Sequence, residues 1–163
     1  MARTRGGRTR RIGLISDTHG LLRPEALEYL AGSDHIIHAG DIGDPAILEA
    51  LASIAPVTAV RGNNDRAPWA DPLREVERLE LGGVALGMIH DLAELDRHAV
   101  LADVRVVVCG HSHRPRVHEH AGTLFVNPGS AGPRRFSLPV AVAHLSIAAG
   151  AVQARIVELA VDP

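Results

Sequence analysis

The chain of 163 residues contains no lysine, one cysteine and very few aromatic residues. These absences limit the composition of the core, the disulfides and the partners that the protein can have. Because lysine is absent, all 17 basic residues are arginine. Because aromatic residues make up only 2% of the chain, the core must consist of alanine, valine, leucine and isoleucine, and base stacking along a nucleic acid is disfavoured. The lone Cys109 excludes an intrachain disulfide and is typical of a reducing cytoplasm.

Long apolar runs are missing as well. No stretch reaches the roughly 18 residues of a membrane-spanning helix, and no apolar signal core follows the basic N-terminus. A formal net charge of −2 gives no overall attraction to nucleic acids or membranes. We expect a soluble, cytoplasmic protein with one domain over residues 11–163 and a flexible, arginine-rich tail over residues 1–10. The tail is either a solvated terminus, which we favour, or an arm that attracts phosphate or RNA.

Short runs rich in isoleucine and valine predict five buried strands. They cover residues 11–16, 35–39, 57–60, 84–89 and 104–109. Helices predicted at residues 24–32 and 44–51 separate the first three runs, and this β-α-β-α-β order implies parallel strands. Further expectations are a hairpin turning at Gly82-Gly83, a helix at 92–101, and strands at 116–120, 123–126, 140–147 and 152–159. The pattern predicts a mixed α/β domain, with two sheets packed face to face and helices outside.

Each of the five runs is followed at once by a side chain that can bind a metal. These residues are Asp17, His19, Asp41, Asn63, His90, His111 and His113. Ligands bind outside the carboxyl ends of strands in α/β sheets, so all seven should surround one pocket. Nitrogen and oxygen donors without a thiolate disfavour a structural zinc site and suit Mn²⁺, Fe, Ni²⁺ or Zn²⁺. Seven donors exceed what one ion needs when water is also bound, which favours two ions sharing a carboxylate.

The order of these motifs resembles that of calcineurin-like metallophosphoesterases. The motifs are Asp17-x-His19, Gly40-Asp41, Gly62-Asn63-Asn64-Asp65, His90 and Gly110-His111-Ser112-His113. Asn127-Pro128-Gly129-Ser130, followed by Pro133-Arg134-Arg135, resembles the small bacterial and archaeal phosphodiesterase branch of that superfamily. The likeness extends from about residue 11 to 158. It implies a four-layer α/β/β/α sandwich, in agreement with the strand pattern.

The resemblance also implies a role for each candidate residue. The implied ligands are Asp17, His19 and His113 for one ion, Asn63, His90 and His111 for the other, and Asp41 as the bridge between them. A hydroxide between the ions would be the nucleophile, so Asp41, His90 and Asn63 would take part directly in catalysis. Asp65 would lie behind the ligands and orient a ligand imidazole through its free N–H.

Asn64 is a departure from the family pattern. Many relatives have a histidine at this position, where it protonates the leaving group or binds phosphate. Asparagine cannot be a general acid at neutral pH, so the chemistry should depend on the metals and on leaving groups that need little protonation. Small members of the branch also lack the histidine. Arg134 and Arg135 would either clamp a phosphate or be solvated.

These patterns predict a dinuclear, metal-dependent phosphodiesterase that hydrolyses a small phosphodiester through attack by metal-bound hydroxide. Mn²⁺ is the favoured metal, with Ni²⁺, Fe and Zn²⁺ as alternatives, and a homo-oligomer would agree with the family. One rival hypothesis is a non-catalytic scaffold, as is thought for the retromer subunit of this fold, although a scaffold need not keep all seven ligand types. The other is a nuclease or RNA-processing enzyme that uses the arginine tail, which predicts steep salt dependence.

Overall fold

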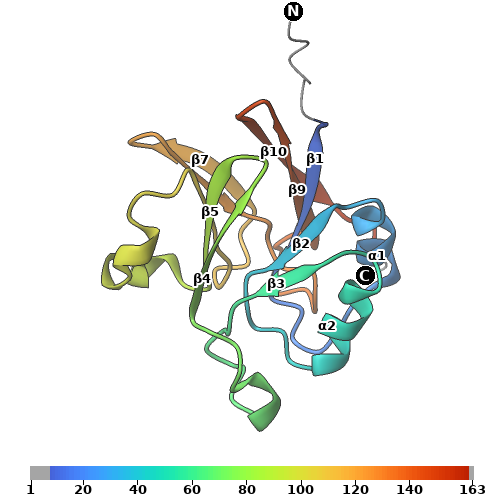
Figure 1. The fold of residues 1–163 in the computed structure, drawn as a ribbon. Coiled ribbons are helices and arrows are strands. Elements are labelled where there is room, and N and C mark those ends of the chain that lie inside the picture. Colours follow the sequence, from blue (N-terminus) through green and yellow to red (C-terminus); the bar gives the residue numbers. More distant parts are fainter. Residues whose placement is uncertain (1–7, 162–163) are drawn as a thin grey trace, which may run out of the picture.

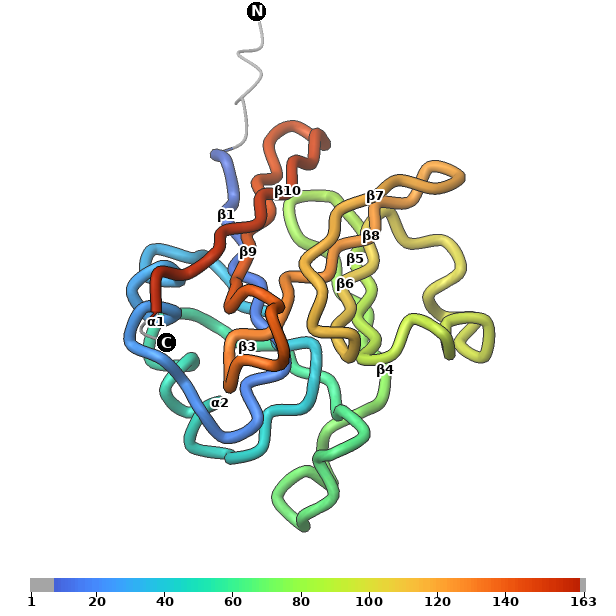
Figure 2. Tube along the Cα trace, turned by 180° about the vertical axis from the view of Figure 1, so that it is seen from behind, coloured from blue at the N-terminus to red at the C-terminus, as the bar shows by residue number. Residues whose placement is uncertain are grey.

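The computed structural model describes residues 8–161, which form two five-stranded sheets packed face to face (Figure 1). The first sheet, in the order β10-β9-β1-β2-β3, consists of β1 (Arg10–Ile15), β2 (His35–His38), β3 (Val57–Ala59), β9 (Ala141–Ala148) and β10 (Ala151–Glu158). The second, in the order β4-β5-β6-β8-β7, consists of β4 (Val76–Leu81), β5 (Val84–Ile89), β6 (Val106–Val108), β7 (Arg116–His120) and β8 (Thr123–Asn127). The two sheets occupy opposite halves of the molecule in Figure 2.

Two short α-helices connect the parallel strands β1, β2 and β3 and pack on the outer face of the first sheet. They are α1 (Pro24–Leu30) and α2 (Pro45–Ala52). Each begins with proline, whose fixed φ suits the first helical turn. The side chain of Asp44 accepts a hydrogen bond from the Ala46 N–H (2.9 Å) and so caps α2.

The outer side of the second sheet differs from the expectation of one helix over residues 92–101. That segment forms two 3₁₀ turns, η2 (Leu92–Arg97) and η3 (Ala99–Leu101), because His98 between them has non-helical backbone angles. A third turn, η1 (Pro68–Ala70), lies between β3 and β4. Leu92, Leu95 and Leu101 nevertheless pack on the second sheet and complete the α/β/β/α order of layers.

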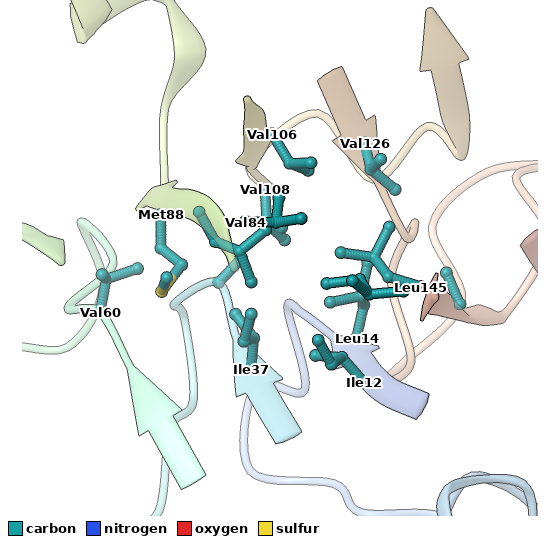
Figure 3. Close-up of a cluster of buried hydrophobic side chains, with 14 residues drawn as sticks. Ile12, Leu14, Ile37, Val60, Val84, Met88, Val106, Val108, Val126 and Leu145 are labelled. Carbon is teal, nitrogen blue, oxygen red and sulfur yellow. The ribbon is translucent and has the colours of Figure 1, made fainter. Parts of the chain in front are cut away.

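The core between the two sheets is aliphatic, as the scarcity of aromatic residues required. Ile12, Leu14 and Ile37 of the first sheet face Val106 and Val108 of the second (Figure 3). The cluster has 14 buried residues and none of them is aromatic. Burial of each such side chain contributes about 1.5–3 kcal/mol. This packing holds the two sheets, and hence the ends of their strands, in a fixed relation.

The first strand begins one residue before the predicted run. It begins at Arg10, which pairs with Ile147 of β9, and Arg8 forms an ion pair with Asp34. The rest of the expected tail, residues 1–7, lies outside the described residues. Within residues 8–161, no helix is long and apolar enough to cross a membrane.

Candidate metal centre

The seven predicted ligands follow the ends of strands from both sheets. In chain order, Asp17 and His19 follow β1, Asp41 follows β2, Asn63 follows β3, His90 follows β5, and His111 and His113 follow β6. Strands β1, β2 and β3 are parallel to one another, and β5 is parallel to β6. Their carboxyl ends therefore bring residues up to 96 positions apart in the sequence into one neighbourhood.

Asp17 is the centre of this cluster. Its Oδ1 lies 3.3 Å from Nε2 of His113, 3.7 Å from Nε2 of His19 and 3.9 Å from Nε2 of His90. Its other oxygen accepts a hydrogen bond from the His111 backbone N–H at 3.1 Å. One carboxylate thus joins the loops that follow β1 and β6.

Asp41 is the second carboxylate of the cluster. Its Oδ2 lies 3.2 Å from Nε2 of His90 and 3.7 Å from Nε2 of His19. Asn64 donates to both of its oxygens, from its backbone N–H and from its side-chain amide, each at 2.9 Å. Asn64 was expected either to support a ligand or to contact the substrate, and in the structure it orients this carboxylate.

Two buried acceptors in this cluster have no hydrogen-bond donor. Nδ1 of His90 lies 2.7 Å from the Ala39 carbonyl, so we assign the ring proton to Nδ1, which leaves a lone pair on Nε2. Nε2 of His90 and Oδ1 of Asp17 are both buried and have no hydrogen-bond partner. Since buried acceptors are costly unless they are satisfied, this arrangement suits a cation as their common partner.

Two sets of three ligand atoms meet this requirement. Asp17, His19 and His113 form one set, and Asp17, Asp41 and His90 form the other; within each set all atoms lie within 4.8 Å of one another. Nε2 of His19 and Nε2 of His113 are 3.3 Å apart. The donors are imidazole and carboxylate, which suit a divalent transition metal. The residues present therefore fit a metal centre.

The backbone of the ligand loops is strained. Eight non-glycine residues among positions 8–161 have positive φ, and five of them are predicted ligands. The five are Asp17 (54°), His19 (46°), Asp41 (54°), His111 (70°) and His113 (62°). Each such conformation costs about 1–3 kcal/mol and persists where the surrounding fold enforces it, most often at functional sites.

Electrostatics keep the two carboxylates ionised. Burial by itself raises the pKa of Asp17, but contacts with His113 and His19 outweigh it and hold this pKa far below its ordinary value. Burial likewise raises the pKa of Asp41, and the hydrogen bonds from Asn64, together with the charge of His90 when its ring is protonated, bring it below its ordinary value. The cluster therefore presents the negative charge that a divalent cation requires.

His38 supports the ligand loops from behind. Burial lowers the pKa of this imidazole to about 4, so the ring is neutral. Its Nδ1 accepts from the Gly40 N–H (3.1 Å) and its Nε2 lies 3.0 Å from Oγ1 of Thr18, which donates in turn to the Ile42 carbonyl (2.8 Å). His38 thus ties the loop of Asp17 to the loop of Asp41.

The hydrogen-bond partners of Asp65 differ from the imidazole that the resemblance implied. Its carboxylate contacts no imidazole among the described residues but accepts backbone N–H groups from Ile42, Gly43 and Gly62 at 2.9–3.1 Å. In the ligand His90, the ring N–H is held instead by the backbone carbonyl of Ala39. Asp65 therefore shapes the loops after β2 and β3 and acts on the ligands only through the backbone.

The last residue of β8 and the segment after it hold the loops of the site in place. Asn127 donates to the Gly110 carbonyl (3.0 Å), and Ser130 donates to the Asp17 carbonyl (3.0 Å). Arg134 and Arg135, by contrast, are exposed. Neither lines the cleft beside His90 or forms an ion pair among residues 8–161. The structure thus favours the solvated alternative for these two arginines.

Asn63 and His111 lie at the edge of the cluster. Asn63 is exposed and shares a cleft of about 420 Å³ with His90, Asp65 and Arg61. The ring of His111 packs edge-on against that of His90, with centroids 5.2 Å apart, and its Nε2 lies 3.8 Å from Asp91. Both residues flank His90, the side of the cluster where the second ion was predicted.

Comparison with known proteins decides the family. Residues 11–150 match the calcineurin-like phosphoesterase superfamily domain. The chain belongs to this superfamily. A probable metallophosphoesterase of Methanocaldococcus jannaschii is 36% identical over 137 residues, which cover 76% of this chain and 69% of that protein. Members of this calcineurin-like family bind divalent metals and act on phosphoesters, in agreement with the prediction from the motifs.

Solved structures share the calcineurin-like fold. Vacuolar protein sorting 29 of Cryptosporidium parvum superposes with a TM-score of 0.75 at 22% identity, over 94% of this chain and 99% of that one. A structure described as a novel archaeal phosphodiesterase gives a TM-score of 0.73 at 20% identity, over 90% and 99% of the two chains. At these identities the likeness establishes the α/β/β/α sandwich and nothing more.

Gly62 provides a test of how closely the loop after β3 approaches the loop after β2. A Cβ at this position would lie 2.1 Å from Oδ1 and 2.2 Å from the backbone nitrogen of Asp41. Because the obstacle includes backbone, we expect Gly62→Ala to displace Asp41, to lower stability by about 1–3 kcal/mol, and to weaken divalent-metal binding by about tenfold or more. Metal binding by calorimetry and unfolding in urea would measure the two effects.

Gly122→Ala is the control for a glycine-to-alanine change without a clash. Gly122 has open space around its Cβ position, and its φ of 82° gives this variant a backbone cost that Gly62→Ala does not have, so the metal affinities and not the stabilities are compared. Equal metal affinity in the two variants would contradict the proposed crowding at Asp41.

Proposed function

We propose that the protein is a metal-dependent phosphodiesterase whose two divalent ions are held by the seven predicted ligands. The observation that carries this proposal is the pair of ligand sets that share Asp17, with unsatisfied acceptors on Asp17 and His90. When bound, two such ions supply Lewis acidity at the phosphoryl oxygens and lower the pKa of coordinated water.

The other residues of the site hold the metal ligands in position. Asn64 holds the Asp41 carboxylate at both oxygens, and the Ala39 carbonyl fixes the His90 ring with Nε2 toward the cluster. No proton can come from Asn64, because an amide does not ionise at neutral pH. This limitation favours esters whose leaving group departs without protonation. A diester with a good leaving group should therefore be a better substrate than an alkyl monoester.

The choice of metal follows from the donors. Carboxylates, imidazoles and an amide oxygen suit Mn²⁺, with Ni²⁺, Fe and Zn²⁺ as competitors. The only cysteine is not part of the set: Cys109 is buried, and burial raises the pKa of its thiol to about 12, so it stays protonated.

The deciding experiment is hydrolysis of bis(p-nitrophenyl) phosphate and of p-nitrophenyl phosphate by metal-free protein titrated with Mn²⁺, Ni²⁺ and Zn²⁺. We expect diester cleavage to rise by at least about a hundredfold over the metal-free protein, to exceed monoester cleavage, and to disappear with a chelator. Binding of two ions per chain without turnover of either ester would refute the proposal and favour the scaffold hypothesis.

A further inference from the structure

A second hollow, of about 280 Å³, adjoins the metal cluster. Its lining includes His111, a predicted ligand, and it shares Asp91 with the larger cleft. The rest of the lining is contributed by η2, by the loop after β6, and by the hairpin of β7 and β8. An ester group of a phosphodiester bound at the cluster can therefore reach this hollow past His111.

The surface of this hollow contains a pair of stacked rings. His118 of β7 and Phe125 of β8 are direct cross-strand partners, with ring centroids 5.0 Å apart and planes inclined by 13°. Leu92 and the protonated thiol of Cys109 line the hollow beside them. In a chain with so few aromatic residues, this pair places the outer face of a ring in the same hollow as the predicted ligand His111. Flat rings are the partners that other planar rings prefer.

The charges of the two depressions differ in sign. The larger cleft is lined by five carboxylates (Asp65, Asp71, Glu75, Asp91 and Glu94) against two arginines. The hollow is lined by Arg114 and Arg116 against the single carboxylate of Asp91. Neither Arg114 nor Arg116 forms an ion pair with a carboxylate in the part of the chain that the structure describes. Apart from the charge that bound metal ions add to the cluster, the lining of the hollow is therefore the more positive of the two and favours an anionic ester.

We propose that this hollow is a substrate subsite that binds a planar ring on one ester group of the phosphodiester, stacked against His118 and Phe125, with Arg114 and Arg116 near its anionic oxygens. The ring is that of a nucleoside or of an aryl ester, since both present the same flat face. This inference rests on the proposed phosphodiesterase function and names its substrate class. The hollow has room for one such group, which fits a small diester and not a long strand of nucleic acid.

The test compares three phosphate monoesters that differ only in the attached group: adenosine 5′-monophosphate, phenyl phosphate and methyl phosphate. Their dissociation constants for the metal-loaded protein are measured by calorimetry, independently of turnover. We expect the two ring-bearing esters to bind at least about tenfold more tightly than methyl phosphate, as stacking on aromatic side chains typically provides.

Two variants test whether the preference for ring-bearing esters comes from the stacked rings of His118 and Phe125. His118→Ala and Phe125→Leu should reduce the preference for ring-bearing esters to within about threefold, with the affinity for methyl phosphate unchanged. His120→Ala is the matched control, because His120 is exposed on the same face of β7 but does not line the hollow. Phe125→Leu keeps an apolar side chain against Leu92 and Leu95, so it tests the ring even if His118→Ala does not fold.

Each outcome has one meaning. Tighter binding of the adenosine ester than of phenyl phosphate supports a nucleoside, and equal binding of the two, both above methyl phosphate, supports an aryl ring. Equal affinity for all three esters overturns the subsite while the proposed function stands. Absence of binding by all three, together with no metal-dependent hydrolysis, overturns both.

Discussion

Replacement of Asp41 by asparagine is expected to lower metal-dependent diester hydrolysis by at least about a thousandfold. The carboxylate of Asp41 lies 3.2 Å from Nε2 of His90 and 3.7 Å from Nε2 of His19, so it adjoins both ligand sets. Asparagine has nearly the same shape but no charge, and its amide nitrogen would place a donor against either His90 or the amide of Asn64. Turnover of bis(p-nitrophenyl) phosphate and the metal content per chain would measure the loss.

The metal-free Asp41→Asn variant should remain folded. Asparagine keeps one oxygen that accepts a hydrogen bond from Asn64 and loses the charge-assisted contact at the other, so we expect the free energy of unfolding to fall by no more than about 1–2 kcal/mol. Asp96→Asn, at an exposed position of η2, is the control for the loss of a carboxylate and should keep full activity. Normal activity in Asp41→Asn would contradict the assignment of the bridging ligand.

Replacement of Asp65 by alanine should have the largest effect on stability. This buried carboxylate accepts hydrogen bonds from the backbone N–H groups of Ile42, Gly43 and Gly62, and alanine would leave all three donors without a partner. Because hydrogen bonds to a charged group are each worth about 1.5–3 kcal/mol, we expect a loss of about 3–5 kcal/mol after some relaxation. Urea unfolding in a chelator gives this value without the contribution of bound metal.

Two further variants give this prediction its controls. Asp65→Asn keeps one acceptor oxygen and should lose less stability than Asp65→Ala. Asp71→Ala removes an exposed carboxylate with no hydrogen bond among the described residues and should change stability by less than about 0.5 kcal/mol. If Asp65→Ala were no less stable than Asp71→Ala, Asp65 would not be holding the two loops together.

The strands were predictable because their signals are local. The run Val84–Ile89 matches β5 residue for residue, and the neighbouring glycines mark the turn that pairs it with β4. Asp44 before Pro45 predicted the start of α2 for the same reason. The segment 92–101 was mispredicted as one helix because nothing in its apolar spacing reveals the non-helical backbone of His98.

The candidate ligands were also visible in the sequence, but their supports were not. Aspartate and histidine directly after a strand are informative by position alone, since parallel strands share one carboxyl end. The partners of Asp65 lie 22 and 23 residues before it and three residues before it, and no spacing rule connects an acid to such backbone groups. His38 and Asn64 likewise acquire their roles only from the loops that pack beside them.

The sequence by itself determined the class of fold, the strands and the chemical types at their ends, because side-chain periodicity and turn chemistry act between neighbouring residues. Only the tertiary structure decided which groups the carboxylates contact, that Arg134 and Arg135 are exposed, and that His118 and Phe125 stack beside His111. Those contacts depend on the register between strands and on how two sheets pack, and both result from the whole core at once.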